Sequence, residues 1–347
     1  MVGAIASKTV QVHLNRRCNL SCAHCYSKSG PSEREQLAAP ALIAFLAEAA
    51  AEGYGVVAFS GGEPFLYPDF VEVLEAAREL GLRRLAVTNG TILTGDRVAA
   101  LPLLDLVAVS VDGSEAVHNR LRRSPTAFAR MRKGLDVIRA AGLSFGIAHT
   151  VTRDSLPDLP WMAAFAAEQG AGVLQLHPLG LVGAAEGMAA GTGGAAGSAA
   201  LDGETLARTW LAALALQAEY GDRLVIHVDL FNRRTLAERP ELVVPGDGGG
   251  AGAPLSEAIN PLILMSNGDL SPICHAIGED FRIGHLGGGS LAGMGRRYRR
   301  EGLADLRALC RMLWEEVTAD AEGWPYLNWY ELLETRSQRA LVYQSVP

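Results

Sequence analysis

Short β-branched segments alternate with alanine-rich helical segments through the first half of the chain. Strands are predicted at residues 10–15, 55–60, 84–89, 106–112, 143–151 and 172–178. Helices are predicted between them, at about residues 40–52, 69–80, 94–101, 126–141 and 159–170. Such strand–helix–strand units build parallel sheets, either open or curved into a barrel. Because barrel chemistry gathers at the carboxyl ends of the strands, functional residues are expected just after each strand.

The composition excludes several classes of protein. Hydrophobic residues make up 49% of the 347 residues and charged residues 20%, which does not fit an intrinsically disordered chain. The net charge of −7 argues against a nucleic acid as the main partner. No apolar run approaches about 18 residues, and the opening MVGAIASKTV is too short and too polar for a signal peptide. The sequence therefore predicts a cytoplasmic protein with no membrane partner, whose thiols stay reduced.

Three of the five cysteines lie within eight residues, in the segment RRCNLSCAHCY. A secreted disulfide scaffold would be shorter and richer in cysteine, so these thiols are better suited to sharing a metal. Cys18, Cys22 and Cys25 have the spacing C-x3-C-x2-C directly after a predicted strand, and could bind three irons of a cubane cluster. The fourth iron would then be open to a small molecule. The alternative is a zinc site with His13 or His24 as the fourth ligand.

A second motif, FSGGEP at residues 59–64, follows the second predicted strand. Its paired glycines let a ligand approach the backbone, and Glu63 adds a carboxylate suited to an ammonium group. The alternative is an ordinary glycine turn. Together, the cysteine motif after the first strand and GGEP after the second resemble the radical S-adenosylmethionine (radical SAM) enzymes, and the resemblance covers about residues 10–180.

The resemblance implies a fold, two cofactors and a reaction. The fold is α/β, a partial (β/α)6 TIM-like barrel, followed here by a small α+β C-terminal extension. The cofactors are a [4Fe–4S] cluster, bound by the three cysteines, and S-adenosylmethionine, whose amino and carboxylate groups chelate the open iron. One-electron reduction then yields a 5′-deoxyadenosyl radical, which abstracts hydrogen from the substrate. The electron is expected from a reducing partner of the flavodoxin or ferredoxin type.

The family's motifs carry over onto particular residues of this chain. Gly61, Gly62 and Glu63 are expected to meet the methionine amino group. The other candidate cofactor contacts are His24 and Tyr26 in the cysteine motif, and Asn89, Ser110, Asp112, Arg122 and His177 further along the chain. Arg122 lies in VHNRLRR, which departs from the family's His-Asp-x-x-Arg-Gly pattern at Asn119 and Arg123, so an exposed arginine is its alternative. For His177 the alternative is a buried structural histidine.

The C-terminal third contains a recognisable hairpin. Two glycine-rich segments, 180–203 and 246–252, are predicted linkers, with a lid as the alternative. After them, Asn267-Gly268 between two apolar runs predicts a β-hairpin that ends at Cys274. The stretch NGDLSPICHAIGEDFRIGHL resembles the start of a SPASM domain, which carries auxiliary iron–sulfur clusters. Only Cys274 and Cys310 remain for such a cluster, too few for four thiolate ligands, so the extension is predicted to be degenerate.

These observations predict three segments: a radical SAM core at residues 8–180, glycine-rich linkers with a helix and a strand at 181–255, and a SPASM-like domain at 256–347. SPASM-like extensions accompany enzymes that modify ribosomally made peptides, so peptide cross-linking or epimerisation is the first hypothesis. Cys274 is the candidate hydrogen donor, with a buried apolar cysteine as its alternative. Because 17 residues precede Cys18, a separate leader-peptide-binding protein is an expected partner. The alternatives are an epimerase or dehydrogenase acting on a small molecule such as a sugar or antibiotic, and a non-catalytic metal-binding scaffold.

Overall fold

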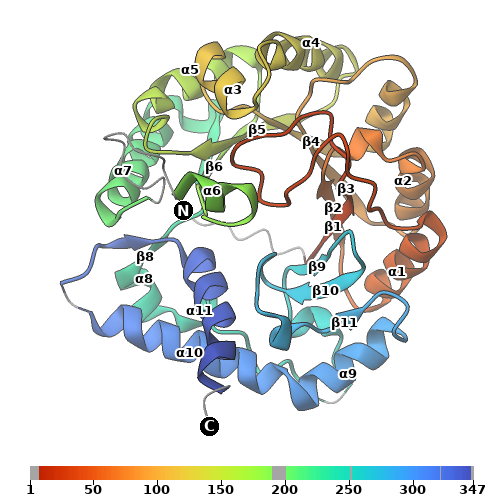
Figure 1. Cartoon of the computed structure of the whole chain (residues 1–347), viewed down its shortest axis with the longest axis vertical. Helices are drawn as coiled ribbons and strands as arrows, with labels where there is room; N and C mark the ends of the chain where they lie inside the picture. The colour runs from red at the N-terminus through yellow and green to blue at the C-terminus, as the bar shows by residue number, and fades with distance from the viewer. Residues whose placement is uncertain (1–7, 190–200, 251, 321, 345–347) are drawn as a thin grey trace.

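A computed structural model describes residues 8–189, 201–250, 252–320 and 322–344, and one ten-stranded sheet dominates it. The parallel part comprises β1 (Thr9–Asn15), β2 (Val56–Gly61), β3 (Arg83–Thr88), β4 (Leu106–Ser110), β5 (Phe145–Val151), β6 (Val173–Pro178) and β7 (Val225–Val228), paired in chain order. Figure 1 shows these strands curving around an interior, with helices on the outside. The predicted α/β partial barrel is confirmed.

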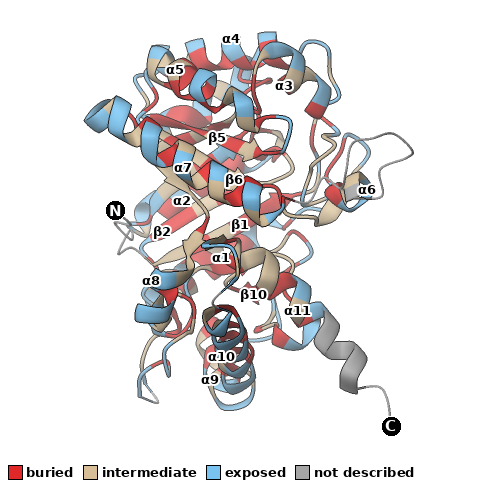
Figure 2. Ribbon diagram, turned by 90° about the vertical axis from the view of Figure 1, so that its left-hand side faces the viewer, coloured by how far each residue is buried: buried red, intermediate tan, exposed pale blue. Residues whose placement is uncertain are grey.

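Amphipathic helices cover the outer face of this sheet. They are α1 (Ala39–Ala51), α2 (Phe70–Glu79), α4 (Ala127–Ala140), α5 (Leu159–Gln169) and α7 (Gly203–Tyr220). In α4, Met131, Leu135 and Ile138 recur at helical spacing and are fully buried, which stabilises the fold by about 1.5–3 kcal/mol for each side chain. Figure 2 shows the buried residues concentrated between the sheet and its helices.

Two local elements differ from the sequence prediction. The α-helix predicted over 94–101 is wrong: residues Gly95–Leu103 form a 3-10 helix. Pro102 lies inside this segment, and its ring removes an N–H donor and clashes with the turn that an α-helix would need. The short α3 (Glu115–Leu121) was not predicted, because seven residues are too few for a helical period to stand out.

The sheet extends at both ends beyond the six predicted strands. At one end, β7 continues it, so the strand predicted within residues 181–255 belongs to the barrel sheet. At the other end, β9 (Leu262–Leu264) pairs in parallel with β1, and the predicted hairpin continues through β10 (Asp269–Pro272) to β11 (Gly284–His285). Strands from all three predicted segments thus share one sheet. Of the two glycine-rich segments, residues 190–200 and 251 lie outside the described residues.

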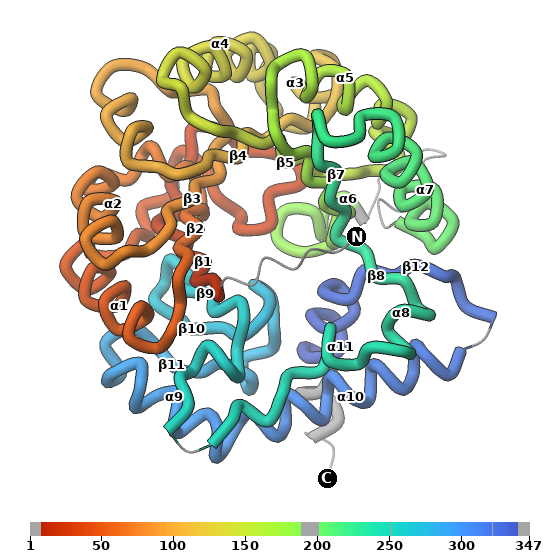
Figure 3. The backbone as a smooth tube through the Cα atoms, turned by 180° about the vertical axis from the view of Figure 1, so that it is seen from behind, coloured from red at the N-terminus to blue at the C-terminus, as the bar shows by residue number. Residues whose placement is uncertain are grey.

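The helix α11 (Trp329–Gln344) stands across the open side of the barrel. Figures 1 and 3 show it between β8 (Phe231–Asn232) and the β9–β11 hairpin. The strand that precedes it, β12 (Tyr326–Leu327), pairs with β8, and Glu334 Oε1 accepts from the Ala276 amide after β10 at 3.0 Å. The remaining helices are α6 (Glu186–Ala189), α8 (Arg233–Glu238), α9 (Leu291–Glu301) and α10 (Leu303–Ala319). In the described part of the chain, no helix is long and apolar enough to span a membrane.

Candidate active site

The cysteine motif forms a loop that is fixed at its base by backbone hydrogen bonds. The Cys18 amide donates to the Gly30 carbonyl at 3.1 Å, and the Gly30 amide donates to the Arg16 carbonyl at 3.1 Å. In the middle of the loop, the Ala23 amide donates to the Leu121 carbonyl at the end of α3, at 2.8 Å. The loop that follows β1 therefore has a defined conformation and packs against the end of α3.

Each of the three sulfurs receives a separate N–H donor. Asn89 Nδ2 lies 3.7 Å from Cys18 Sγ, Arg122 Nη1 lies 3.8 Å from Cys22 Sγ, and the Ser29 amide lies 3.3 Å from Cys25 Sγ. These cysteines are free, and donors to sulfur stabilise the thiolate form that ligates iron. Among the described residues, no three His, Cys, Asp or Glu side chains gather around the position of a single metal ion.

Burial opposes ionisation of Cys18 and Cys22. It raises the pKa of Cys18 to about 12, with the Glu63 carboxylate adding to the effect, and it also raises the pKa of Cys22. The N–H donor from Arg122 acts in the opposite direction on Cys22. The positive charge of a bound metal centre would favour the thiolate form of Cys18 and Cys22, and the three free sulfurs with their N–H donors fit three ligands of an iron–sulfur cluster.

The GGEP motif packs against the base of the cysteine loop. The Gly62 amide donates to the Asn15 carbonyl at 2.7 Å, and a Cβ on Gly62 would lie 2.2 Å from the Arg17 carbonyl oxygen. Gly61 has a φ of +118° and a Cβ there would lie 2.5 Å from the Asn15 carbonyl oxygen. Both glycines are thus required by the close approach of two backbones, whatever contact they make with a ligand.

The Glu63 carboxylate is fully buried and turned toward β3. It accepts from the Asn89 amide at 2.9 Å, from the Thr88 hydroxyl at 2.8 Å and from the Phe65 amide at 3.3 Å. Burial raises the pKa of Glu63 to about 7, although these hydrogen bonds act against the shift. In this structure Glu63 connects the end of β2 to the end of β3, and its contact with the methionine amino group stays a prediction.

A buried ionic network connects the cysteine loop to the end of β4. Asp112 Oδ2 lies 2.6 Å from Arg122 Nε and 3.3 Å from His24 Nε2, and Asp112 is fully buried. Burial alone would raise the pKa of Asp112, but Arg122 and His24 outweigh it and hold this pKa well below its usual value. Three residues predicted as cofactor contacts therefore meet in one network, and the exposed alternative for Arg122 is wrong, because it is 9% exposed.

Three other predicted residues lie outside this network. Ser110 ends β4 and is half-buried, while the Tyr26 hydroxyl lies 3.0 Å from Ser60 Oγ at the end of β2. His177 lies near the end of β6 and its side chain is 46% exposed, so the buried-histidine alternative is wrong. The contacts of Tyr26, Ser110 and His177 with a cofactor stay predictions.

The barrel also brings together residues that were not among the predicted cofactor contacts. His275, next to the end of the hairpin, lies with its ring centroid 4.6 Å from that of His13 and 5.1 Å from that of Tyr26. His13 Nε2 is buried without a hydrogen-bond partner among the described residues. Asp229, just after β7, contacts His177 Nδ1 through its carboxylate. Asp229 lies near the end of a strand predicted from the sequence and could have been found by position, and His275 directly follows Cys274, the predicted end of the hairpin.

Cys274 lies in the apolar core and is 3% exposed. Burial, followed by the negative charge of Glu334 on α11, raises the pKa of the Cys274 thiol well above its usual value. The thiol therefore keeps its hydrogen, but a substrate would have to reach it past α11. Its role as a hydrogen donor stays a prediction.

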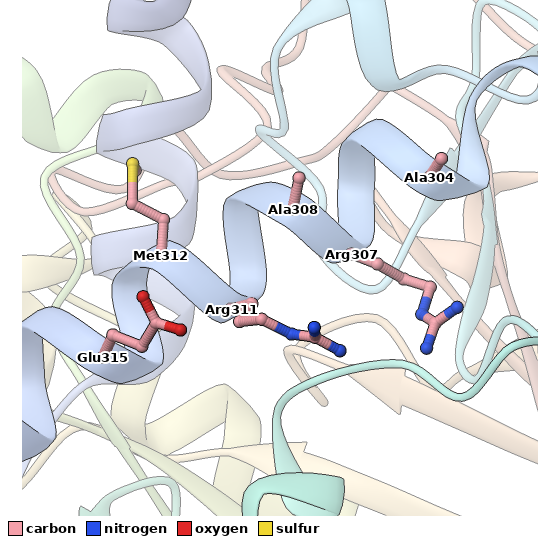
Figure 4. A pocket seen from close by; sticks show the side chains of 6 residues that line it. All are labelled: Ala304, Arg307, Ala308, Arg311, Met312 and Glu315. Carbon is pink, nitrogen blue, oxygen red and sulfur yellow. The ribbon is translucent and has the colours of Figure 1, made fainter.

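A hollow elsewhere on the molecule has no connection to these groups. Figure 4 shows it along one face of α10, lined by Ala304, Arg307, Ala308, Arg311, Met312 and Glu315. A neighbouring hollow shares Arg307 and Arg311. Neither contains any residue of the cysteine loop or of the strand ends, so the candidate site is the barrel interior.

The fold and the site together define a class of protein: a parallel barrel domain with a loop of three cysteines that are suited to bind an iron–sulfur cluster. Residues 12–159 match the family model of the radical SAM superfamily. The chain therefore carries a radical SAM domain, and members of this superfamily use a [4Fe–4S] cluster and S-adenosylmethionine.

Curated relatives are similar over this domain. An AdoMet-dependent heme synthase from Oleidesulfovibrio alaskensis is 33% identical over 162 residues, which cover 45% of this chain and 41% of the relative. A PqqA peptide cyclase from Gluconobacter oxydans is 36% identical over 170 residues, which cover 47% of each protein. The chain thus spans about half the length, or less, of these curated relatives.

Solved structures are similar over more of the chain. Streptococcus suis SuiB bound to S-adenosylmethionine matches with a TM-score of 0.65 at 16% identity, covering 87% of this chain and 68% of SuiB. The AdoMet-bound enzyme anSMEcpe matches with a TM-score of 0.64 at 15% identity, covering 97% of this chain and 93% of that one. At such identities the likeness concerns the fold, and it includes the C-terminal part as well as the barrel.

Proposed function

We propose that this protein is a radical SAM enzyme that modifies a ribosomally made peptide, by cross-linking or epimerisation. Cys18, Cys22 and Cys25 would hold the cluster. Bound together, the cluster and S-adenosylmethionine supply a carbon-centred radical that abstracts a hydrogen atom from the substrate. The observation that carries the cofactor half of the proposal is the set of three free sulfurs, each with its own N–H donor.

The chain's own residues would position S-adenosylmethionine. Gly61 and Gly62 have no side chains, so the methionine amino group could approach their backbone beside the cysteine loop. Asn89 lies beside Cys18, and the Asp112–Arg122 pair lies beside Cys22, so polar groups are available on two sides of the cluster position. Glu63, Ser110, His24 and Tyr26 would complete the set, while His177, near the end of β6, is assigned to the substrate instead.

Two comparisons support a peptide as the substrate. The fold likeness extends through the C-terminal part to SuiB and anSMEcpe, which have also been solved bound to the precursor peptide SuiA and to the Cp18Cys peptide respectively. Sequence relatives include a PqqA peptide cyclase and a mycofactocin maturase. A reducing protein of the flavodoxin or ferredoxin type and a separate leader-peptide-binding protein would be its partners.

The relatives named AdoMet-dependent heme synthase favour a second candidate, a small-molecule substrate. Sugars and antibiotics belong to the same alternative. The two candidates differ in what must enter the barrel, since a peptide needs an extended path whereas a compact molecule needs a closed chamber.

Anaerobic reconstitution tests the cofactor half. We expect about four irons for each chain, the content of one cubane, and 5′-deoxyadenosine on addition of S-adenosylmethionine and dithionite. Alanine variants of Cys18, Cys22 and Cys25 should lose both, while Cys310→Ala, a matched control in α10, should keep both. A wild-type protein that binds zinc but no iron, or releases no 5′-deoxyadenosine, would contradict the proposal and favour a non-catalytic scaffold.

The substrate half needs a separate assay. Short peptides encoded beside this gene are incubated with the reconstituted enzyme, and their masses and stereochemistry are determined. A loss of hydrogen or an epimerised residue supports the proposal. Unchanged peptides, together with turnover of a porphyrin or sugar, would support the small-molecule candidate. In the same assay, Cys274→Ala tests hydrogen donation: an epimerase should lose product but keep 5′-deoxyadenosine formation.

A further inference from the structure

The carboxyl ends of β6 and β7 carry a histidine and an aspartate in direct contact. β6 and β7 are parallel neighbours with Leu176 opposite Val228, and the Asp229 amide donates to the Leu176 carbonyl at 3.0 Å. This register places Asp229 beside His177, whose Nδ1 contacts Asp229 Oδ2. Gln175, two residues earlier on β6, donates through Nε2 to the other carboxylate oxygen of Asp229. Both carboxylate oxygens are therefore engaged by side chains of β6.

We propose that His177 and Asp229 form a proton-accepting dyad that serves the substrate side of the barrel. With Nδ1 engaged by the carboxylate, Nε2 is the ring nitrogen available to a substrate, and no hydrogen bond of the described residues engages it. The His177 side chain keeps 46% of its surface exposed, so a ligand can reach it. A carboxylate that orients an imidazole and stabilises its protonated form is the arrangement that general bases use.

The surroundings of the dyad favour this role. Burial alone would lower the pKa of His177, but Asp229, with a contribution from Asp112 just after β4, outweighs it, and the net pKa is raised. Burial lowers the pKa of His149 on β5 and of His275 after β10, and the charge of His177 contributes to both shifts. Of these three histidines, His177 is the one whose pKa is raised.

The helix α11 lies close to the chain segment that follows the dyad. Burial, followed by the negative charge of Asp229, raises the pKa of Tyr330 on α11 to about 12. The Tyr330 ring also packs edge-on against Phe231, with centroids 5.9 Å apart. The dyad therefore lies at the strand ends, with α11 in contact with Phe231, two residues beyond Asp229.

The proposed step moves one proton and no electron. A substrate N–H or O–H bond, or a C–H bond next to a radical centre, breaks and its proton forms a bond to His177 Nε2. The imidazolium that results is paired with the Asp229 carboxylate, so the dyad changes from a net charge of −1 to 0. This inference rests on the proposed function, because it assigns a task to the substrate side of the same barrel.

Site-resolved acylation of the reconstituted holoenzyme tests the dyad without knowledge of the substrate. Diethyl pyrocarbonate acylates neutral imidazole, and mass spectrometry follows each of the eight histidines separately as a function of pH. We expect His177 to react with a midpoint pH above that of a synthetic peptide spanning residues 172–182. Asp229→Asn should move this midpoint down by about one pH unit, a tenfold change in the neutral fraction at a given pH, whereas the exposed control Asp222→Asn should not.

Three results would overturn the inference: no acylation of His177, a wild-type midpoint equal to that of the peptide, or an unchanged midpoint in Asp229→Asn. If Asp229→Asn does not fold, the midpoint pH of His177 in the wild type, compared with that of the peptide, still tests the inference. Formation of 5′-deoxyadenosine is measured in the same preparation. Its absence would contradict the proposed function, while the acylation profile reports on the dyad alone.

Discussion

The buried pair of Arg122 and Asp112 allows a sharp prediction about stability. Asp112 is fully buried, Arg122 is 9% exposed, and Nε and Oδ2 are 2.6 Å apart. Arg122→Met keeps much of the side-chain length but leaves the Asp112 carboxylate without its main counter-charge. Removing one partner of a buried ion pair costs about 3–5 kcal/mol, because the remaining charge is buried without compensation. We therefore expect the free energy of unfolding to fall by about that amount.

The chain offers a matched control two residues away. Arg120 pairs with Asp154 at 3.2 Å, but the two side chains are 58% and 77% exposed, so Arg120→Met should cost at most about 1 kcal/mol. Urea unfolding of the reconstituted proteins under anaerobic conditions, followed by circular dichroism, measures both variants. The reasoning is refuted if Arg122→Met destabilises the protein no more than Arg120→Met does.

Three further predictions concern the same site. Burial raises the pKa of Glu63 from about 4.3 in the unfolded chain to about 7, so the folded state holds an extra proton between these pH values. As the pH rises from 4.5 to 7.5, the free energy of unfolding of the wild type should therefore fall by up to about 3 kcal/mol relative to that of Glu63→Gln. Parallel pH profiles of unfolding, or the same trend in the exposed control Glu72→Gln, would contradict this. A Cβ on Gly134 of α4 would lie 2.0 Å from the Gly90 carbonyl oxygen, so Gly134→Ala should displace the loop that carries Asn89 and weaken the cluster's absorbance on reconstitution; full iron content with unchanged spectra would argue against it. S-adenosylmethionine at a hundredfold excess over its dissociation constant should add about 2.7 kcal/mol to the stability of the holoenzyme and nothing to that of the cluster-free protein, as measured by thermal unfolding.

Local sequence patterns predicted the barrel well, for a physical reason. Strands such as β1 and β4 are short β-branched runs, and α4 has a clear helical period, so burial and propensity agree at each segment. The prediction failed where one residue overrides a pattern, as Pro102 does in its 3-10 helix. It was also silent where two segments far apart in the chain pair with each other, as β9 does with β1, because no local periodicity encodes a partner.

The same distinction applies to the site. Cys18, Cys22 and Cys25 could be found because they are neighbours in the sequence. Their N–H donors could not be assigned by spacing, since Arg122 reaches Cys22 across 100 residues through the packing of α3 on the cysteine loop. Asp229 illustrates the same limit, because its contact with His177 depends on the β6–β7 register, which the sequence did not specify.

Asp112 links the two halves of the site. It holds Arg122, which donates to Cys22, and its charge also contributes to the raised pKa of His177 on the substrate side. A single buried carboxylate thus influences both the sulfur environment of the cluster and the basicity of the proposed dyad. Because Coulomb interactions in a poorly solvated interior are screened weakly, this coupling does not require direct contact between Asp112 and His177. The cluster loop and the substrate side are therefore best regarded as one electrostatic unit, in which a change of charge on either side is felt by the other.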